Sequence, residues 1–373
     1  MARLRLEIDR LSDFLESLGA EGREVIGPKV VDDAIVYAPI TGVEDLPKGI
    51  VDEQAPGRYR LNDTGGDALF DHVVGPHAWK RYLYPPEHRL CSMVASADGF
   101  TVEAEPQQAP ARVFFGVRAC DLAAIHVLDK VFDNGDFADT GYNARRRASL
   151  IVAVNCGRAG GTCFCASMNT GPKAEAGYDI AMTEVPDGGY FVVEAGSPEG
   201  AALLGPLGLV EAAPAEIDAA DARVAEAAQS MVREMIPDAA DVLRRNLDSP
   251  HWDKIAERCL NCANCTMACP TCFCTTVEDT TDLSGEHAER WRKWNSCFTI
   301  DFSYMHGGSL RRSGGARYRQ WMTHKLAHWH DQFDSSGCVG CGRCIAWCPV
   351  GIDITEEARV FEHLEQGANH DGD

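Results

Sequence analysis

Two cysteine runs with identical spacing constrain this chain more than any other feature of its sequence. Each run follows the pattern C-x2-C-x2-C-x3-C-P. The first comprises Cys259, Cys262, Cys265 and Cys269, and the second comprises Cys338, Cys341, Cys344 and Cys348. The region from Trp252 onward is also broken by Gly and Pro and shows little alternation of β-branched residues. This part of the chain therefore folds around thiol-bound groups rather than around a large apolar core.

The spacing within each run indicates 4Fe-4S clusters. It is the four-cysteine pattern of bacterial ferredoxins, in which three thiolates curl around one cubane and the fourth Cys ligates the other cluster. We therefore assign Cys259, Cys262, Cys265 and Cys348 to cluster 1, and Cys338, Cys341, Cys344 and Cys269 to cluster 2. Structural zinc is the alternative, but it closes with four tetrahedral ligands and does not require three evenly spaced Cys followed by Cys-Pro.

The composition narrows the compartment and the partners. The N-terminus, MARLRLEIDRLSDFLESLGAEG, lacks the features of a secretory signal, so we expect a cytoplasmic protein whose 16 Cys are reduced. No apolar run approaches the roughly 20 residues of a membrane span, so we expect no membrane span. The net charge of -21 argues against nucleic acid as a partner and favours other proteins.

The hydrophobic pattern predicts two domains and a connector. Residues 1–196 are expected to form an α/β domain, in which RVFFGV and SLIVAVN are strands and AMTEV and YFVVEA flank a hairpin turn at Pro186-Asp187-Gly188-Gly189. Residues 197–250 are rich in Ala and acidic residues and are expected to form a helical connector. Residues 251–366 are predicted to be a mainly α-helical dicluster ferredoxin-like domain, and 367–373 a disordered tail.

About 70 residues separate the two cysteine runs, and we expect this insert to be helical. Both HAERWRKWNSCF and RYRQWMTHKLAHW are interpreted as helices. The tryptophans of this insert are expected to pack in the core around the clusters rather than to form a cofactor cage. They are Trp291, Trp294, Trp321 and Trp329.

The tetrapeptide TCFC occurs twice, and the first copy suggests a third cluster. Cys163 and Cys165 lie one residue apart, so an extended backbone places both thiols on one face. Cys120 and Cys156 each follow a predicted strand, and parallel strands bring such ends together. A third 4Fe-4S cluster on Cys120, Cys156, Cys163 and Cys165 is one hypothesis. A group of reduced or zinc-bound thiols is the other, because the spacing is irregular.

The remaining cysteines and one basic segment stay open at this stage. Cys272 and Cys274, in the second TCFC, could join Cys297 in a further site or only line the cluster pocket, and Cys91 is expected to be an isolated buried thiol. The segment HGGSLRRSGGARYRQ carries four arginines in an acidic protein: Arg311, Arg312, Arg317 and Arg319. It is either a solvated loop or a surface that docks a partner or tunes the clusters.

The cysteine blocks resemble those of one known family. GVRACDLAAI, VNCGRAGGTCFCASMNTGP, CLNCANCTMACPTCFC, WRKWNSCF and GCVGCGRCIAWCPVGIDI occur in this order, between about Arg112 and Ile354. In these motifs the chain resembles the iron-sulfur β subunit of soluble nickel-iron (sulf)hydrogenases. The electron-transfer subunit of anaerobic sulfite reductase is a member of the same family and is resembled equally. The region before Arg112 carries no recognised motif.

The resemblance implies an electron-transfer subunit of a multi-subunit oxidoreductase. FAD and NAD(P) are then expected on a flavin reductase subunit, and nickel and iron on the hydrogenase small and large subunits; a sulfite reductase complex is the alternative. The chain itself has no Rossmann motif after a strand, no clear P-loop and no pair of C-x2-C motifs for a nickel centre. We therefore expect no catalytic residue here. A stand-alone ferredoxin-like carrier is less favoured because a carrier does not need the α/β domain.

Overall fold

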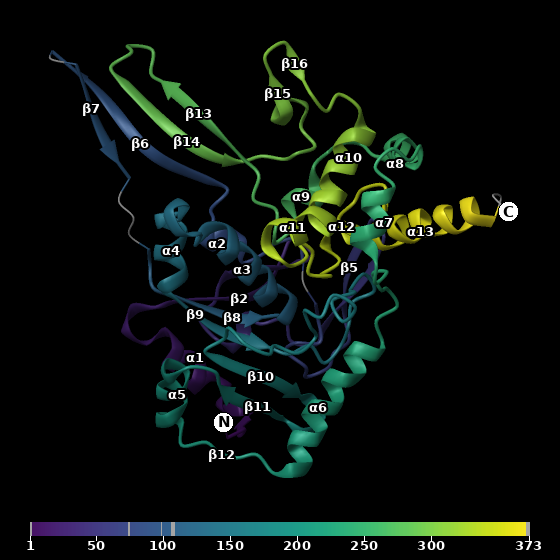
Figure 1. Cartoon of the computed structure of the whole chain (residues 1–373). Helices are drawn as coiled ribbons and strands as arrows, with labels where there is room; N and C mark the ends of the chain where they lie inside the picture. Colours follow the sequence, from purple (N-terminus) through teal and green to yellow (C-terminus); the bar gives the residue numbers. More distant parts are fainter. Residues whose placement is uncertain (1, 74, 98, 106–108, 371–373) are drawn as a thin grey trace.

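An eight-stranded mixed sheet forms the lower part of the molecule in the computed structural model (Figure 1). The structure describes residues 2–73, 75–97, 99–105 and 109–370. From one edge to the other the strands are β12 (Val210–Glu211), β1 (Leu4–Glu7), β11 (Tyr190–Ala195), β10 (Ile180–Val185), β9 (Ser149–Val154), β8 (Arg112–Val117), β2 (Glu24–Val31) and β3 (Ala34–Pro39). The central strands β10, β9, β8 and β2 are parallel, and the outer pairs are antiparallel.

Helices cover both faces of this sheet, which explains why its central strands are nearly continuous apolar runs. Helices α1 (Leu11–Gly19) and α5 (Pro198–Leu204) pack on the face that includes Val113 and Phe115. Helices α3 (Ala119–Phe132) and α4 (Thr140–Arg147) pack on the opposite face, which includes Phe114. The alternation along β8 thus feeds two separate cores. The expected strands, the first helix and the hairpin of the N-terminal region are all confirmed.

The connector contributes to this same sheet. Strand β12 pairs with β1 at the edge of the sheet, so the sheet extends past residue 196. Helix α6 (Pro214–Gln229) then packs its Ala220 against Tyr190 and Val192 of β11. Helix α7 (Ala239–Arg245) follows and packs in the core of the cysteine-rich region.

A second, four-stranded antiparallel sheet contradicts one sequence prediction. Its order is β13 (Thr275–Thr281), β14 (His287–Trp294), β6 (Glu87–Ser96) and β7 (Gly99–Ala104), and it projects from the body of the molecule (Figure 1). HAERWRKWNSCF is therefore a strand over most of its length and not a helix. Pairing with β6, from a distant part of the chain, overrides the local helical propensity. A mainly α-helical C-terminal domain is accordingly not confirmed.

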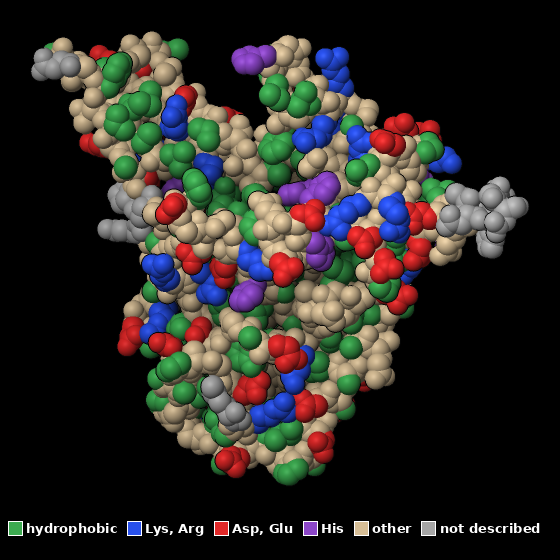
Figure 2. All heavy atoms as spheres, viewed as in Figure 1, with side chains coloured by type: hydrophobic (Ala, Val, Ile, Leu, Met, Phe, Trp, Pro, Cys, Tyr) green, Lys and Arg blue, Asp and Glu red, His purple; other side chains and the backbone are tan. Residues whose placement is uncertain are grey.

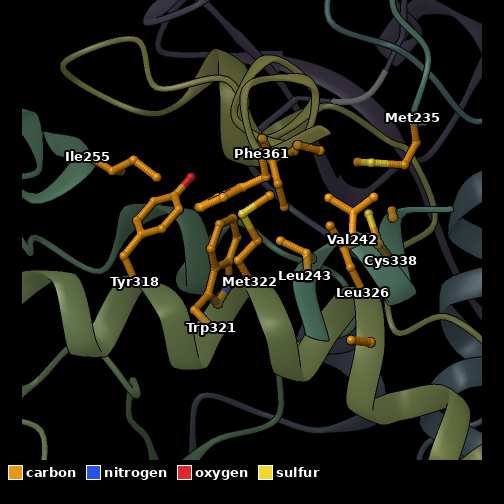
Figure 3. Packing of buried hydrophobic residues seen from close by; sticks show 14 of the residues in the cluster. Met235, Val242, Leu243, Ile255, Tyr318, Trp321, Met322, Leu326, Cys338 and Phe361 are labelled. Atoms are coloured by element: carbon orange, nitrogen blue, oxygen red, sulfur yellow. The ribbon is translucent and has the colours of Figure 1, made fainter. Parts of the chain in front are cut away.

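Short helices surround the two cysteine runs. They are α8 (His251–Arg258), α9 (Asn264–Met267), α10 (Gly314–Thr323), α11 (Trp329–Phe333), α12 (Arg343–Ala346) and α13 (Ile354–His370), with a π-helical turn at His324–His328. The segment RYRQWMTHKLAHW is helical as expected. Figure 3 shows the core between them, where Trp321, Met322 and Phe361 are buried together. Helix α13 continues through the start of the predicted tail, and residues 371–373 lie outside the described residues.

The remaining elements are small. They are α2 (Lys80–Leu83), the hairpins β4 (Ile50–Ala55)–β5 (Arg58–Asp63) and β15 (Tyr304–Met305)–β16 (Gly308–Ser309), and 3-10 turns at Ile8–Arg10, Ala20–Gly22, Val43–Asp45, Gly135–Phe137, Pro186–Gly188, Gly205–Leu207 and Ile300–Ser303. Among the described residues, no helix combines the length and the apolar character needed to cross a bilayer.

Candidate iron-sulfur sites

The two cysteine runs share a backbone conformation that their spacing alone does not specify. In the first run Asn261 and Ala263 have left-handed φ values of 53° and 66°, and in the second Gly340 and Gly342 have φ values of 63° and 74°. These residues stand at equivalent positions, and each second one precedes a short helix, α9 or α12. Such turns are costly for residues other than Gly. Their repetition indicates that both runs fold as the same cysteine-presenting loop.

The first run lines a cavity together with the last Cys of the second run. Cys259, Cys262, Cys265 and Cys348 all lie on its wall, with Cys344 beside them. The space between the lining atoms is about 440 Å³ and part of it opens to solvent. Phe298, Tyr318 and Trp321 form the apolar side of the wall. The structure thus brings together the four thiols that the crossed assignment groups as cluster 1, although their ligation remains a prediction.

Backbone N–H groups point at sulfur atoms in this cavity. The N–H of Asn261 donates to Cys259 Sγ at 3.4 Å, and the N–H of Ile352 donates to Cys348 Sγ at 3.3 Å. Hydrogen bonds of this kind favour a charged thiolate over a neutral thiol. Nearby Arg317 also acts to lower the pKa of Cys259, which burial otherwise raises. The residues present therefore fit a group that binds thiolates.

The second set lies deeper in the protein. Cys269, Cys338 and Cys341 are buried, and burial raises the pKa of Cys344 well above its ordinary value, with Cys338, Cys341 and Cys269 as its charged neighbours. Crowded buried thiols resist losing their protons unless a cation compensates the charge. Metal coordination supplies such compensation, because metal-bound thiols are deprotonated. These four residues were assigned together from sequence, and the structure places them near one another.

The proposed third set also comes together, at the carboxyl ends of parallel strands. Cys156 follows β9 closely, and Cys120 lies in the first turn of α3, one residue beyond the turn where the sequence placed it. Burial raises the pKa of Cys163 to about 12, and neighbouring Cys156 contributes to the shift. Cys165 has Cys163 and Cys156 as neighbours. The four thiols occupy one region, which is the arrangement that the third-cluster hypothesis requires.

Both copies of TCFC contact the second cysteine run. In the first copy the N–H of Phe164 donates to the carbonyl of Gly340 at 2.8 Å. In the second copy Thr271 Oγ1 donates to the carbonyl of Gly337 at 2.7 Å. The repeated tetrapeptide therefore packs twice against the same loop, from two different parts of the chain.

A buried ion pair ties the second run to the third set. Arg343 makes two hydrogen bonds with Asp121, which adjoins Cys120, and both side chains are almost fully buried. Tyr37 donates its hydroxyl to the same carboxylate at 2.8 Å. Desolvation is the first effect on such a pair, and a bidentate geometry with a further donor compensates it. The sequence analysis placed Asp121 near a helix start but missed its partner.

Two buried lysines were also missed from the sequence. Lys80 and Lys325 are only 3% and 5% exposed, and both lie beside the second TCFC. The signal that could have found Lys325 is its position within the apolar helical segment MTHKLAHW. No comparable pattern surrounds Lys80.

The other singled-out residues divide between core and surface. Trp321 and Trp329 are buried as expected, whereas Trp291 and Trp294 are half-buried on β14. Cys91 is not buried but half-exposed on β6. Arg317 is buried and donates to the carbonyls of Arg311 and Arg312, so the basic segment is not simply a solvated loop. On the face shown in Figure 2, basic and acidic side chains are interspersed.

In the part of the chain that the structure describes, no three His, Cys, Asp or Glu side chains converge as they would around a single metal ion. A 4Fe-4S cluster poses a different geometric demand, because each thiolate binds a different iron. The paired loops, the crossed Cys348 and the N–H groups directed at sulfur are the features that fit such a cluster. Together they define the class of this molecule as an iron-sulfur protein with a dicluster ferredoxin-type domain.

Comparison with known proteins agrees with this class and narrows it. Residues 258–352 match the 4Fe-4S dicluster domain family. The chain is also 34% identical to Sulfhydrogenase 2 subunit beta of Pyrococcus furiosus over 259 residues, which cover 68% of this chain and 74% of that protein. The chain belongs to the family of sulfhydrogenase β subunits. No solved structure matches the chain.

Proposed function

We propose that this protein is the electron-transfer subunit of a cytoplasmic multi-subunit oxidoreductase. It relays electrons between a flavin subunit that uses NAD(P)H and a nickel-iron hydrogenase module. The observation that carries this proposal is the pair of cysteine loops with matching left-handed turns, inside a chain of the sulfhydrogenase β family. Clusters held by thiolates change charge by single electrons, so they supply the electron-carrying chemistry of such a subunit.

The residues that would hold the clusters follow from the sequence assignment. Cys259, Cys262, Cys265 and Cys348 hold cluster 1, and Cys338, Cys341, Cys344 and Cys269 hold cluster 2. Cys120, Cys156, Cys163 and Cys165 hold a third 4Fe-4S cluster in this proposal. Their proximity and the crowding of buried thiols support the grouping.

The three sets are arranged in series. Cys165 and Cys120 both have Cys341 as a neighbour, which connects the third set to the second. Cys265 has Cys269 as a neighbour, and Cys344 has Cys265, which connects the second set to the first. The order third, second, first gives the protein a continuous route from the α/β domain to the cavity of the first set. The exposed Cys262 marks the end of that route nearest solvent.

The protein's own residues prepare these sites without doing chemistry on a substrate. Burial excludes water from the second and third sets, the N–H groups of Asn261 and Ile352 orient sulfur atoms, and Lys325 donates to Cys269 Sγ. Such contacts set reduction potentials. We assign no catalytic residue to the chain, and FAD, NAD(P) and nickel belong to partner subunits in this proposal.

The corresponding subunit of a sulfite reductase complex is the second candidate, because the same cysteine blocks serve both. Partner identity separates the two. Purification of the native complex under anaerobic conditions, with each subunit identified by mass, is expected to yield a nickel-containing large subunit and a flavin subunit. A sirohaem-containing or sulfite-reducing partner would instead assign the chain to sulfite reduction. Recovery of the chain alone would favour a stand-alone carrier.

A further inference from the structure

The two buried lysines call for negative charge that no carboxylate supplies. Lys325 Nζ lies 2.8 Å from Thr271 Oγ1, 3.2 Å from the Gly337 carbonyl and 3.3 Å from Cys269 Sγ. Lys80 Nζ lies 3.0 Å and 2.8 Å from the carbonyls of Cys269 and Cys272. Among the described residues neither ammonium forms an ion pair with Asp or Glu. Buried charges are normally paired, so the counter-charge must come from the sulfur atoms around them.

The sulfur atoms available exceed those that the ferredoxin-type clusters use. Cys272 shares a hydrogen bond with Cys269, and Cys274 shares one with Cys297. Neither Cys272, Cys274 nor Cys297 belongs to the three sets described above. One thiolate, Cys269, faces two ammonium groups, and further thiolates beside it would balance both.

The fold holds these three extra thiols in place from two distant segments. Cys274 directly precedes β13, and its carbonyl accepts the N–H of Asn295 at 2.8 Å, which brings the end of β14 and then Cys297 alongside it. Cys297 also has Cys265 of the first set as a neighbour. Trp294 closes the site, with Lys80 Nζ 3.9 Å from the centroid of one of its rings. The strand β14, which the sequence analysis interpreted as a helix, is thus what delivers Cys297.

We propose that Cys272, Cys274 and Cys297 ligate an additional 4Fe-4S cluster, with Lys80 and Lys325 as its buried counter-charges. Three protein thiolates bind three irons, and the fourth iron carries a ligand that is not a protein thiol. Thiolate is the ligand that iron-sulfur clusters use, and potentials depend on the charges and donors around the sulfurs. This inference rests on the proposed function, because it places the new site between the first and second sets.

The pKa values are consistent with a charged environment. Burial alone lowers the pKa of Lys325, but Cys269 and Cys272 raise it well above its ordinary value, so its ammonium stays charged. Burial lowers the pKa of Lys80 to about 8, against the opposing effect of the same thiols. A cationic wall therefore faces the three thiols at neutral pH.

Native mass spectrometry of the anaerobic wild-type chain tests the proposal directly, because it weighs protein and bound inorganic atoms together. We expect the mass of four clusters. The double variant Cys274→Ser Cys297→Ser should lose one cluster, about four iron and four sulfide, and keep the reduced-state EPR signals of the ferredoxin-type pair. The matched control is Cys91→Ser, a half-exposed thiol on β6, which should lose nothing.

Several results would overturn the inference. Wild-type inorganic mass that corresponds to three clusters or fewer would do so without any variant, even if the double variant failed to fold. Unchanged iron in the folded double variant would do so as well, as would a Cys274–Cys297 disulfide in the anaerobically purified wild type. Failure of the proposed function is distinct: it would appear as loss-free Cys341→Ala and Cys259→Ala variants.

Discussion

Arg343 Nη1 lies 2.7 Å from Asp121 Oδ1, with both side chains shielded from solvent. Arg343 opens the helix that follows Cys341, and Asp121 follows Cys120 in the first turn of α3. The pair therefore joins two cysteine sets through a direct polar link. Because the two residues are 222 positions apart in the chain, it also fixes the cysteine-rich region onto the α/β domain.

Breaking this pair should destabilise the protein strongly. Asp121→Asn leaves a buried guanidinium without its anion, which typically costs about 3–5 kcal/mol. Chemical denaturation of the anaerobic chain would measure the loss. Glu53→Gln, which removes the partner of the half-exposed Arg58, is the control and should cost less than about 1 kcal/mol. Equal effects of the two substitutions would contradict the structural role assigned to the buried pair.

Gly342→Ala should disturb the second cysteine run. A Cβ at this position would lie 2.2 Å from the carbonyl oxygen of Thr162, and the backbone φ of 74° is itself unfavourable for Ala. We expect reduced iron content and a lower thermal midpoint. Gly208→Ala is a matched control, because Gly208 has a φ of 58° but no atoms within 4 Å of its Cβ position. It should cost only the backbone strain, about 1–2 kcal/mol. Similar outcomes for both variants would argue against a tight contact with Thr162.

Glu184 should make stability depend on pH. Burial raises its pKa from 4.5 to about 7, although the N–H groups of Leu69 and Phe70 donate to its carboxylate. Between pH 4.5 and 7 the folded state then holds a proton that the unfolded state has released, so this carboxyl's contribution to stability falls as pH rises. Glu184→Gln should remove that fall. Denaturation midpoints measured from about pH 4.5 to about pH 7.5 check it, with exposed Glu199→Gln as the control that keeps the wild-type slope.

Lys325→Met should lower the reduction potential of the second cluster. The ammonium donates to Cys269 Sγ, and positive charge beside a ligand sulfur favours the reduced, more negative cluster. We expect a downward shift on the order of 60 mV, a tenfold change in the one-electron equilibrium. EPR-monitored potentiometric titration measures it. Lys325→Arg, which keeps the charge, should shift the potential less, and an upward shift in Lys325→Met would refute the assigned role.

Much of the α/β architecture could be predicted because its signals are local. Strands β8 and β9 are buried on both faces and are therefore continuous apolar runs, and the PDGG turn announces the β10–β11 hairpin. Strand β14 could not be predicted from its own residues. HAERWRKW contains good helix formers, and only the pairing with β13 and β6 makes it extended. Tertiary contacts from a distant segment carry no mark in the local sequence.

The cysteine sets show the same division. Spacing alone was enough to group Cys259, Cys262, Cys265 and Cys348, because the crossed pattern has few other uses, and the structure places them on one cavity. Spacing could not reveal Lys80, whose carbonyl partners lie 189 and 192 residues away. Nor could it group Cys272 and Cys274 with Cys297, since their proximity depends on β14.

The central claim, that the two cysteine runs hold crossed ferredoxin-type clusters, is tested most directly by EPR spectroscopy of the chemically reduced anaerobic chain. The wild type should show two such signals. Cys341→Ala should lose the signal of cluster 2 and about four iron per chain, while the signal of cluster 1 persists. Survival of both signals with full iron content would contradict the assignment.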